Sequence, residues 1–126
     1  MKTLGKAVGE KRLALGLTQR EFASRVRFED GHSISATYLC VIEQGVYKPR
    51  GHIIAEFARV LGANPDVFFY LAGRVPPDVC EIDATNEELE AAFEAFRRVL
   101  RDGCRRAAHK PGRDLAPSRE SVGSAI

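Results

Sequence analysis

Residues 17–45, LTQREFASRVRFEDGHSISATYLCVIEQG, carry the signals that decide the fold. Thr18 and Glu21 have the spacing of a capping box, in which a hydroxyl and a carboxylate each bind a backbone amide at the start of a helix. Ser35 is placed to cap another helix, and Gly45 has the conformational freedom to end it. The stretch therefore predicts two short helices separated by a polar segment.

The apolar residues of this stretch recur at helical spacing. Phe22, Ala23 and Val26 predict the buried face of the first of these two helices, and Leu39 and Ile42 predict that of the second. The polar segment between them contains a glycine, which is typical of a turn or loop.

Helix signals continue on both sides of this stretch. A helix is expected over residues 4–15, because a glycine follows it. Beyond the stretch, apolar positions predict a fourth helix ending at Gly62 and a fifth beginning at Pro65, a residue favoured at the first helical position. No alternating strand pattern competes, so residues 1–75 are expected to form an all-α domain of five short helices.

The ordered set of these motifs resembles the helix-turn-helix domain of the lambda-repressor and Cro-like (Xre-type) transcriptional regulators. The matching segments are RLALGLTQREFA at 12–23, ISATYLCVIEQG at 34–45 and IAEFARVLGANPDVF at 54–68. The resemblance extends over residues 3–74. It implies a five-helix lambda-repressor-like domain that binds double-stranded DNA in a prokaryotic or phage setting.

The resemblance assigns base contacts to the helix that begins near Ser35. A recognition helix enters the major groove by its N-terminal end, so residues just after the cap reach base edges. Alanine, threonine and valine are weak readers of bases, and specificity is expected to depend also on Gln44, on the inserted loop or on DNA shape. The implied base contacts are Ser35, Ala36, Thr37, Val41 and Gln44.

Two further groups of residues follow from the resemblance. Side chains near the ends of these helices are expected to bind backbone phosphates, in part with the help of a helix N-terminus. The implied phosphate contacts are Gln19, Arg20, Lys48 and Arg50. A structural ion pair is implied between Arg12 and Glu43, which would join the first and third helices.

The segment from Arg27 to Ile34 is about six residues longer than the turn that joins such helices in most relatives. Either the second helix continues past Val26, or a loop carrying charged side chains projects beside the DNA. A tolerated surface insertion is the alternative to a role in recognition.

Residues 76–102 are expected to hold a linker and a further amphipathic helix. The apolar residues of that helix have spacings of four, three and four, which place them on one seam. Acidic residues lead the helix and arginines end it, matching the helix dipole. The seam residues are Leu89, Phe93, Phe96 and Leu100.

Such a seam must be buried either on the preceding domain or against a second copy of the chain. The residues VPPD at 75–78 separate the helix from the domain, which favours a homodimer. A dimer would present two recognition helices about 34 Å apart, matching a pseudo-palindromic site. Residues 103–126 lack a periodic pattern and are expected to form a disordered tail.

Charge is unevenly distributed along the chain. The 126 residues carry a net charge of +2, but residues 1–50 hold nine basic and five acidic side chains, whereas residues 81–101 hold three basic and six acidic ones. This distribution indicates either a basic first part that faces nucleic acid and an acidic-led segment that faces another partner, or ordinary solvation of the surface.

Other classes of function find no support in the sequence. No apolar run reaches the roughly 18 residues that span a bilayer, and the start has no apolar leader core, so a cytoplasmic protein without a membrane partner is expected. The cysteines and histidines lack metal-ligand or catalytic spacing. We therefore expect no enzyme activity, catalytic residue, metal or cofactor.

These features predict a sequence-specific, DNA-binding transcriptional regulator that acts as a dimeric repressor. The alternative is an antitoxin or other protein-interaction module on the same scaffold. Such a module would bind a protein partner through the C-terminal helix or the tail.

Overall fold

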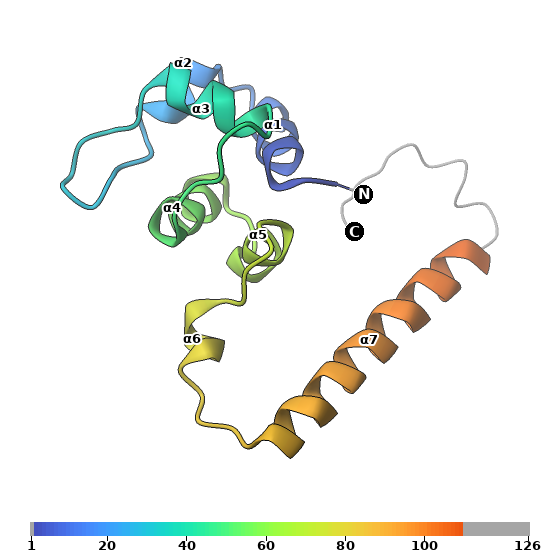
Figure 1. Ribbon diagram of the computed structural model, residues 1–126. Coiled ribbons are helices and arrows are strands. Elements are labelled where there is room, and N and C mark those ends of the chain that lie inside the picture. Colours follow the sequence, from blue (N-terminus) through green and yellow to red (C-terminus); the bar gives the residue numbers. More distant parts are fainter. Residues whose placement is uncertain (1, 110–126) are drawn as a thin grey trace. The chain divides into compact units, whose positions relative to one another are not determined.

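The computed structural model describes residues 2–109 (Figure 1). Within this range the chain forms seven α-helices and no strand beyond one isolated bridge, which confirms the all-α class. The helices are α1 (Leu4–Ala14), α2 (Gln19–Ala23), α3 (Ala36–Glu43), α4 (Gly51–Leu61), α5 (Pro65–Leu71), α6 (Pro77–Cys80) and α7 (Asn86–His109). The chain divides into two compact units between Ile82 and Asp83, so that α1 to α6 lie in the first unit and α7 in the second.

The first unit has a hydrophobic core to which α1 to α5 all contribute. Helix α1 packs on α3, α4 and α5, while α2 packs on α3 and α4 on α5. The rings of Phe22 and Phe57 lie at the centre of this core, fully buried, with their centroids 5.6 Å apart. Leu39 and Ile42 are also buried, as the sequence predicted. One face of α3 therefore packs into the core, and its opposite face lies at the surface.

Side-chain caps fix where α2 and α3 begin. The Thr18 amide donates to Glu21 Oε1 over 2.8 Å, and the Glu21 amide donates to Thr18 Oγ1 over 3.0 Å, which completes the predicted capping box. Ser35 Oγ accepts from the Tyr38 amide over 3.0 Å at the start of α3. After α3, Gly45 adopts a positive φ of 81°, a left-handed conformation that glycine enters without steric cost.

Helix α2 is shorter than the sequence predicted, and the expectation that it includes or passes Val26 is wrong. The helix ends at Ala23, although the Val26 side chain is fully buried. The Val26 carbonyl accepts a hydrogen bond from the Ile34 amide over 2.9 Å. The Val26 carbonyl is therefore bonded to the segment that leads into α3 and not to a further turn of α2. The Val26 side chain is buried without being part of a helix.

Glycines on α1 allow this helix to approach α3 closely. A Cβ atom at Gly5 would lie 2.5 Å from the carbonyl oxygen of Ile42, a separation that real Cβ atoms do not adopt. One turn later, a Cβ atom at Gly9 would lie 3.4 Å from the carboxylate of Glu43. The absence of a side chain at Gly5 therefore sets the spacing between α1 and the C-terminal end of α3, whereas the contact at Gly9 is an ordinary van der Waals separation.

Helix α7 begins with a second capping box and runs further than expected. The Thr85 amide donates to Glu88 Oε1 over 2.8 Å, and the Glu88 amide donates to Thr85 Oγ1 over 3.1 Å. The helix continues through Gly103 to His109, so the predicted start of a disordered tail at residue 103 is wrong. A single glycine costs a helix only about 1 kcal/mol and does not end it. The remainder of the predicted tail, residues 110–126, lies outside the described residues.

The segment between α5 and α7 also differs from its expected form as a plain linker. It contains the single-turn helix α6, which begins with a proline at its first position. Over residues 2–109, none of the helices combines the length and the apolar character needed to cross a bilayer.

Candidate functional site

The outward face of α3 carries a stripe of side chains at helical spacing. Thr37, Val41 and Gln44 follow one another at intervals of four and three residues, and therefore lie on one side of the helix. Thr37 and Gln44 are exposed and Val41 is half-buried. Of the other residues assigned to base contacts, Ser35 is exposed and Ala36 is half-buried. All five are accessible at the surface of the first unit.

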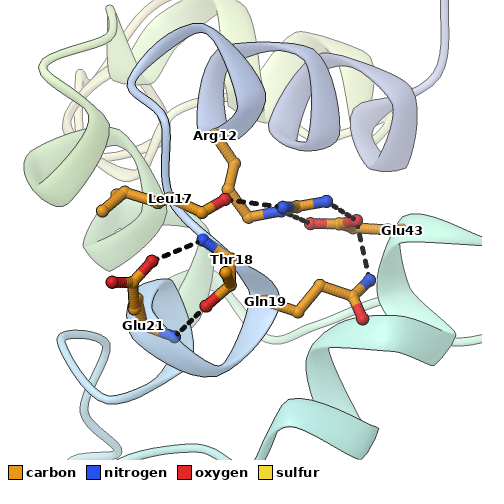
Figure 2. Close-up of polar contacts among 6 residues, drawn as sticks. All are labelled: Arg12, Leu17, Thr18, Gln19, Glu21 and Glu43. Atoms are coloured by element: carbon orange, nitrogen blue, oxygen red, sulfur yellow. Dashed lines mark hydrogen bonds and ion pairs between the residues drawn. The ribbon is translucent and has the colours of Figure 1, made fainter.

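A buried ion pair fixes α3 relative to α1 (Figure 2). Arg12 donates through Nε to Glu43 Oε2 over 2.8 Å and through Nη2 to Glu43 Oε1 over 3.0 Å. The third donor, Nη1, binds the carbonyl oxygen of Leu17 over 2.8 Å, in the turn before α2. The two charged side chains are only 10% and 11% exposed. The structure thus forms the ion pair implied between Arg12 and Glu43 and ties it to a third point of the backbone.

The hydrogen bonds to Glu43 raise the pKa of the Arg12 guanidinium above its already high ordinary value, while burial acts in the opposite direction. The guanidinium therefore stays charged wherever the domain is folded. A bidentate pair of this kind fixes orientation as well as distance, because two parallel hydrogen bonds allow little rotation.

Gln19 joins the same network, which the sequence did not indicate. Its Nε2 donates to Glu43 Oε1 over 3.0 Å, and Figure 2 shows its amide oxygen directed away from Glu43. One amide hydrogen is thus engaged inside the protein, and the second remains for an outside acceptor. Gln19 therefore links the start of α2 to the end of α3 within the protein itself.

The segment between α2 and α3 forms a small hairpin, which Figure 1 shows as a narrow loop extending from the helices. An antiparallel bridge pairs Arg27 with Ser33, and the Phe28 amide donates to the His32 carbonyl over 2.8 Å. Gly31 occupies the tight turn with a φ of 92°. Of the two alternatives that the sequence left open for this insertion, the loop is the one that forms, and its own hydrogen bonds order it.

Helix α4 anchors the base of this hairpin. The Arg27 amide donates to Glu56 Oε1 over 3.2 Å, and the Arg27 carbonyl lies 3.0 Å from His52 Nε2. Glu56 also accepts two hydrogen bonds from Arg59. The bonds from Arg59, followed by the Arg27 amide, lower the pKa of Glu56 from 4.5 to about 2, against the opposing effect of burial. The anchoring carboxylate is therefore ionised at all ordinary pH values.

Three aromatic rings form a row between the hairpin and the end of α3. Phe28 and Tyr38 have ring centroids 5.5 Å apart, and Tyr38 and Tyr47 have centroids 5.4 Å apart. Phe28 is 37% exposed and Tyr47 is 44% exposed. Burial, and then the neighbouring Tyr47 hydroxyl, raise the pKa of Tyr38, while the charge of Arg50 lowers it. Sequence reasoning missed this row, because no periodic signal relates a loop phenylalanine to a tyrosine on α3.

Basic side chains assigned to phosphate contacts are also exposed. Arg20 lies on α2, and Lys48 and Arg50 lie on the segment that leads from α3 to α4. Within residues 2–109, none of these three forms an ion pair with a carboxylate. Their charges therefore remain available to an anionic partner.

The second unit presents the seam predicted on α7. The residues of this seam, Leu89, Phe93, Phe96 and Leu100, are 45%, 50%, 45% and 44% exposed. In the described part of the chain no cluster of three or more His, Cys, Asp or Glu side chains is placed to hold a metal ion. Comparison with protein-family models, with curated proteins and with solved structures gave no significant match.

Proposed function

We propose that this protein is a sequence-specific DNA-binding regulator of transcription, built on a lambda-repressor-like helix-turn-helix formed by α2 and α3. The observation that carries the proposal is the arrangement of α3. Its outward stripe of Thr37, Val41 and Gln44 stands on a helix whose other face is locked into the core. An α-helix fits the major groove of B-DNA, and a fixed helix presents its side chains to base edges in one register.

The chemistry of the stripe suits direct readout of A·T-rich steps. Thr37 and Val41 offer methyl groups that can contact the C5-methyl group of thymine, and the Thr37 hydroxyl can bond either a base or a phosphate. Gln44 has the amide that pairs with adenine N6 and N7. In the free protein its Nε2 lies 3.5 Å from Cys40 Sγ, a weak acceptor that a base edge would replace.

The surroundings of α3 supply phosphate donors. Arg20 and Lys48 lie on either side of α3 in the chain, and each carries a charge that no carboxylate in the described residues neutralises. The hydroxyls of Tyr38 and Tyr47 add neutral donors of the kind that bind phosphate oxygens. Affinity would then depend strongly on salt, because each neutralised phosphate releases a counterion.

Repression is the expected outcome of such binding, through occupancy of a site that polymerase needs. A dimer would place two copies of α3 on successive turns of one face of the duplex, so the preferred site would be an inverted repeat. None of these steps requires a reaction at a residue of this chain.

Selection of bound fragments from random duplex DNA tests the proposal. The expected result is enrichment of an inverted repeat with half-sites about ten base pairs apart, centre to centre. Recovery of unenriched sequence, at an affinity equal to that for bulk DNA, would contradict sequence-specific binding.

Variants assayed on the selected site would then separate base contacts from phosphate contacts. Gln44→Ala should weaken binding about tenfold or more and relax preference at one position of each half-site. Lys48→Gln should weaken binding to all sequences alike and reduce the slope of log K against log salt by about 1 per site. Arg98→Gln on α7 removes the same charge from the other unit and serves as the matched control, with no expected change.

A further inference from the structure

The seam on α7 reads the same in both directions. Leu89, Phe93, Phe96 and Leu100 are separated by four, three and four residues, with leucine at both ends and phenylalanine at both central positions. A sequence with this symmetry can be laid against a reversed copy of itself, so that each leucine meets the other leucine and each phenylalanine the other phenylalanine. The spacing is that of the alternating a and d positions of a heptad repeat, the pattern of paired helices.

The positions that flank the seam carry opposite charges. With Leu89 and Phe96 at d positions, Glu90 and Arg97 occupy the two e positions beside them. Leu89 and Phe93 line a hollow on α7 together with Glu90 and Arg97, and Asn86 and Glu94 complete its lining. Two charged side chains of opposite sign therefore border one side of the apolar seam, seven residues apart.

Charge is also divided between the two halves of α7. The acidic half, up to residue 96, carries Glu87, Glu88, Glu90 and Glu94, and the basic half, from residue 97, carries five arginines and one carboxylate, Asp102. Two parallel copies would place acidic half beside acidic half and basic half beside basic half. Two antiparallel copies would place each acidic half beside a basic half and would also oppose the helix dipoles favourably.

We propose that α7 pairs antiparallel with α7 of a second copy of this chain, about the midpoint between Phe93 and Phe96. In this register Leu89 faces Leu100 and Phe93 faces Phe96, while Glu90 of each copy lies beside Arg97 of the other. Gly103 of each copy faces Asn86 of the other, so the apolar contact ends in the same way on both sides. The inference rests on the dimer of the proposed function and specifies how it forms, but it does not depend on whether α3 binds DNA.

Charge reversal tests the pairing of Glu90 with Arg97, using the full chain in analytical ultracentrifugation. The wild-type chain should be a dimer at micromolar concentration. Glu90→Arg and Arg97→Glu should each raise the dissociation constant about tenfold or more, because each creates two like-charge contacts. The double variant E90R/R97E should restore the dimer, and an equimolar mixture of the two single variants should form a heterodimer.

Matched controls on α7 exclude a general effect of charge. Glu94→Arg and Arg98→Glu make the same changes away from the e positions and should leave the dissociation constant within about threefold of the wild type. A monomeric wild-type chain would overturn the proposal, as would failure of the double variant to restore pairing while circular dichroism shows α7 intact.

Disulfide cross-linking reports the orientation independently. In a chain whose three native cysteines are replaced by serine, Leu89→Cys and Leu100→Cys chains should cross-link when mixed and not when kept apart. In the antiparallel register two copies of residue 89 are separated by 11 positions, about 16 Å along the helix, beyond the reach of a disulfide. Self-cross-linking of the Leu89→Cys chain would show a parallel pair and overturn the proposal. Loss of sequence-specific DNA binding by a chain that still cross-links in this way would instead remove the proposed function alone.

Discussion

Two pairs of phenylalanine side chains have different surroundings in the two units. In the first unit Phe22 and Phe57 come from different helices and are fully buried against each other. In the second unit Phe93 and Phe96 lie on one helix, and each is about half exposed. The first unit builds its core from α1 to α5, whereas α7 exposes the apolar seam that the proposed dimer would bury. The comparison separates a unit whose phenylalanine rings complete an internal core from a helix whose rings are exposed, and the proposed dimer assigns association to that helix.

The largest expected effect comes from removing one ring of the buried pair. Phe57→Ala should destabilise the first unit by about 3–5 kcal/mol, because it leaves a cavity at the centre of the core. Phe93→Ala should change the same quantity by less than about 0.5 kcal/mol. The chain has three tyrosines, all in the first unit, and no tryptophan, so tyrosine fluorescence during urea unfolding reports on that unit alone.

The order of the two variants should reverse when the dissociation constant of the dimer is measured in place of stability. Phe93→Ala should weaken dimerisation about tenfold or more, because aromatic residues dominate interface energies. If tyrosine fluorescence showed an equal loss in the free energy of unfolding for both variants, the distinction between the two units would be wrong.

The next largest effect concerns ion pairs. Arg12→Met should cost the first unit about 3 kcal/mol, because it leaves the carboxylate of Glu43 buried without its partner. Arg105→Met breaks the exposed pair with Asp102 on α7 and should cost less than about 0.5 kcal/mol. Thermal unfolding by circular dichroism measures both, and similar costs for the two variants would mean that burial does not set the strength of the Arg12 pair.

Glycine-to-alanine substitutions should change stability in opposite directions in the two units. Gly5→Ala places a methyl group against the Ile42 carbonyl and should destabilise the first unit by about 2 kcal/mol. Among the described residues no atom lies within 4 Å of a Cβ at Gly103, so Gly103→Ala should stabilise α7 by about 0.5–1 kcal/mol. Urea unfolding and helix content by circular dichroism check the pair. A neutral Gly5→Ala variant would contradict the close approach of α1 to α3.

The smallest expected effect is a dependence on pH from the anchor of the hairpin. The lowered pKa of Glu56, about 2, means that its contribution is present above its unfolded value of 4.5 and is lost as the pH falls through 2. Glu56→Gln should therefore be about 1 kcal/mol less stable than the wild type at pH 7, with the difference shrinking between pH 5 and pH 2. A constant difference across this range would mean that ionisation of Glu56 does not secure the hairpin.

Local signals accounted for much of the fold. The capping box at Thr18 and Glu21, the cap at Ser35 and the apolar positions Leu39 and Ile42 act within one or two helical turns, and each appears in the structure as predicted. Such contacts depend only on residues a few positions apart, so they can be predicted from the sequence.

Contacts between distant segments were harder to foresee. The bond from Gln19 to Glu43 and the ring contact between Phe28 and Tyr38 depend on how the hairpin and the helices pack. The pair formed by Arg12 and Glu43 was foreseen only through a family resemblance. Helix α2 ends before Val26, whose carbonyl accepts from the Ile34 amide across the hairpin, a pairing that the apolar spacing of the helix does not indicate.

Amide chemical shifts recorded while a selected duplex is added to the full chain give the most direct test of how the two units divide their work. The largest shifts are expected at Thr37, Val41 and Gln44, with smaller ones along the hairpin. Amides of α7 from Leu89 to Leu100 should remain unchanged, because in the proposed dimer that seam is already covered by the second copy. Shifts concentrated on α7, with α3 unaffected, would contradict the assignment of DNA binding to the first unit and of pairing to the second.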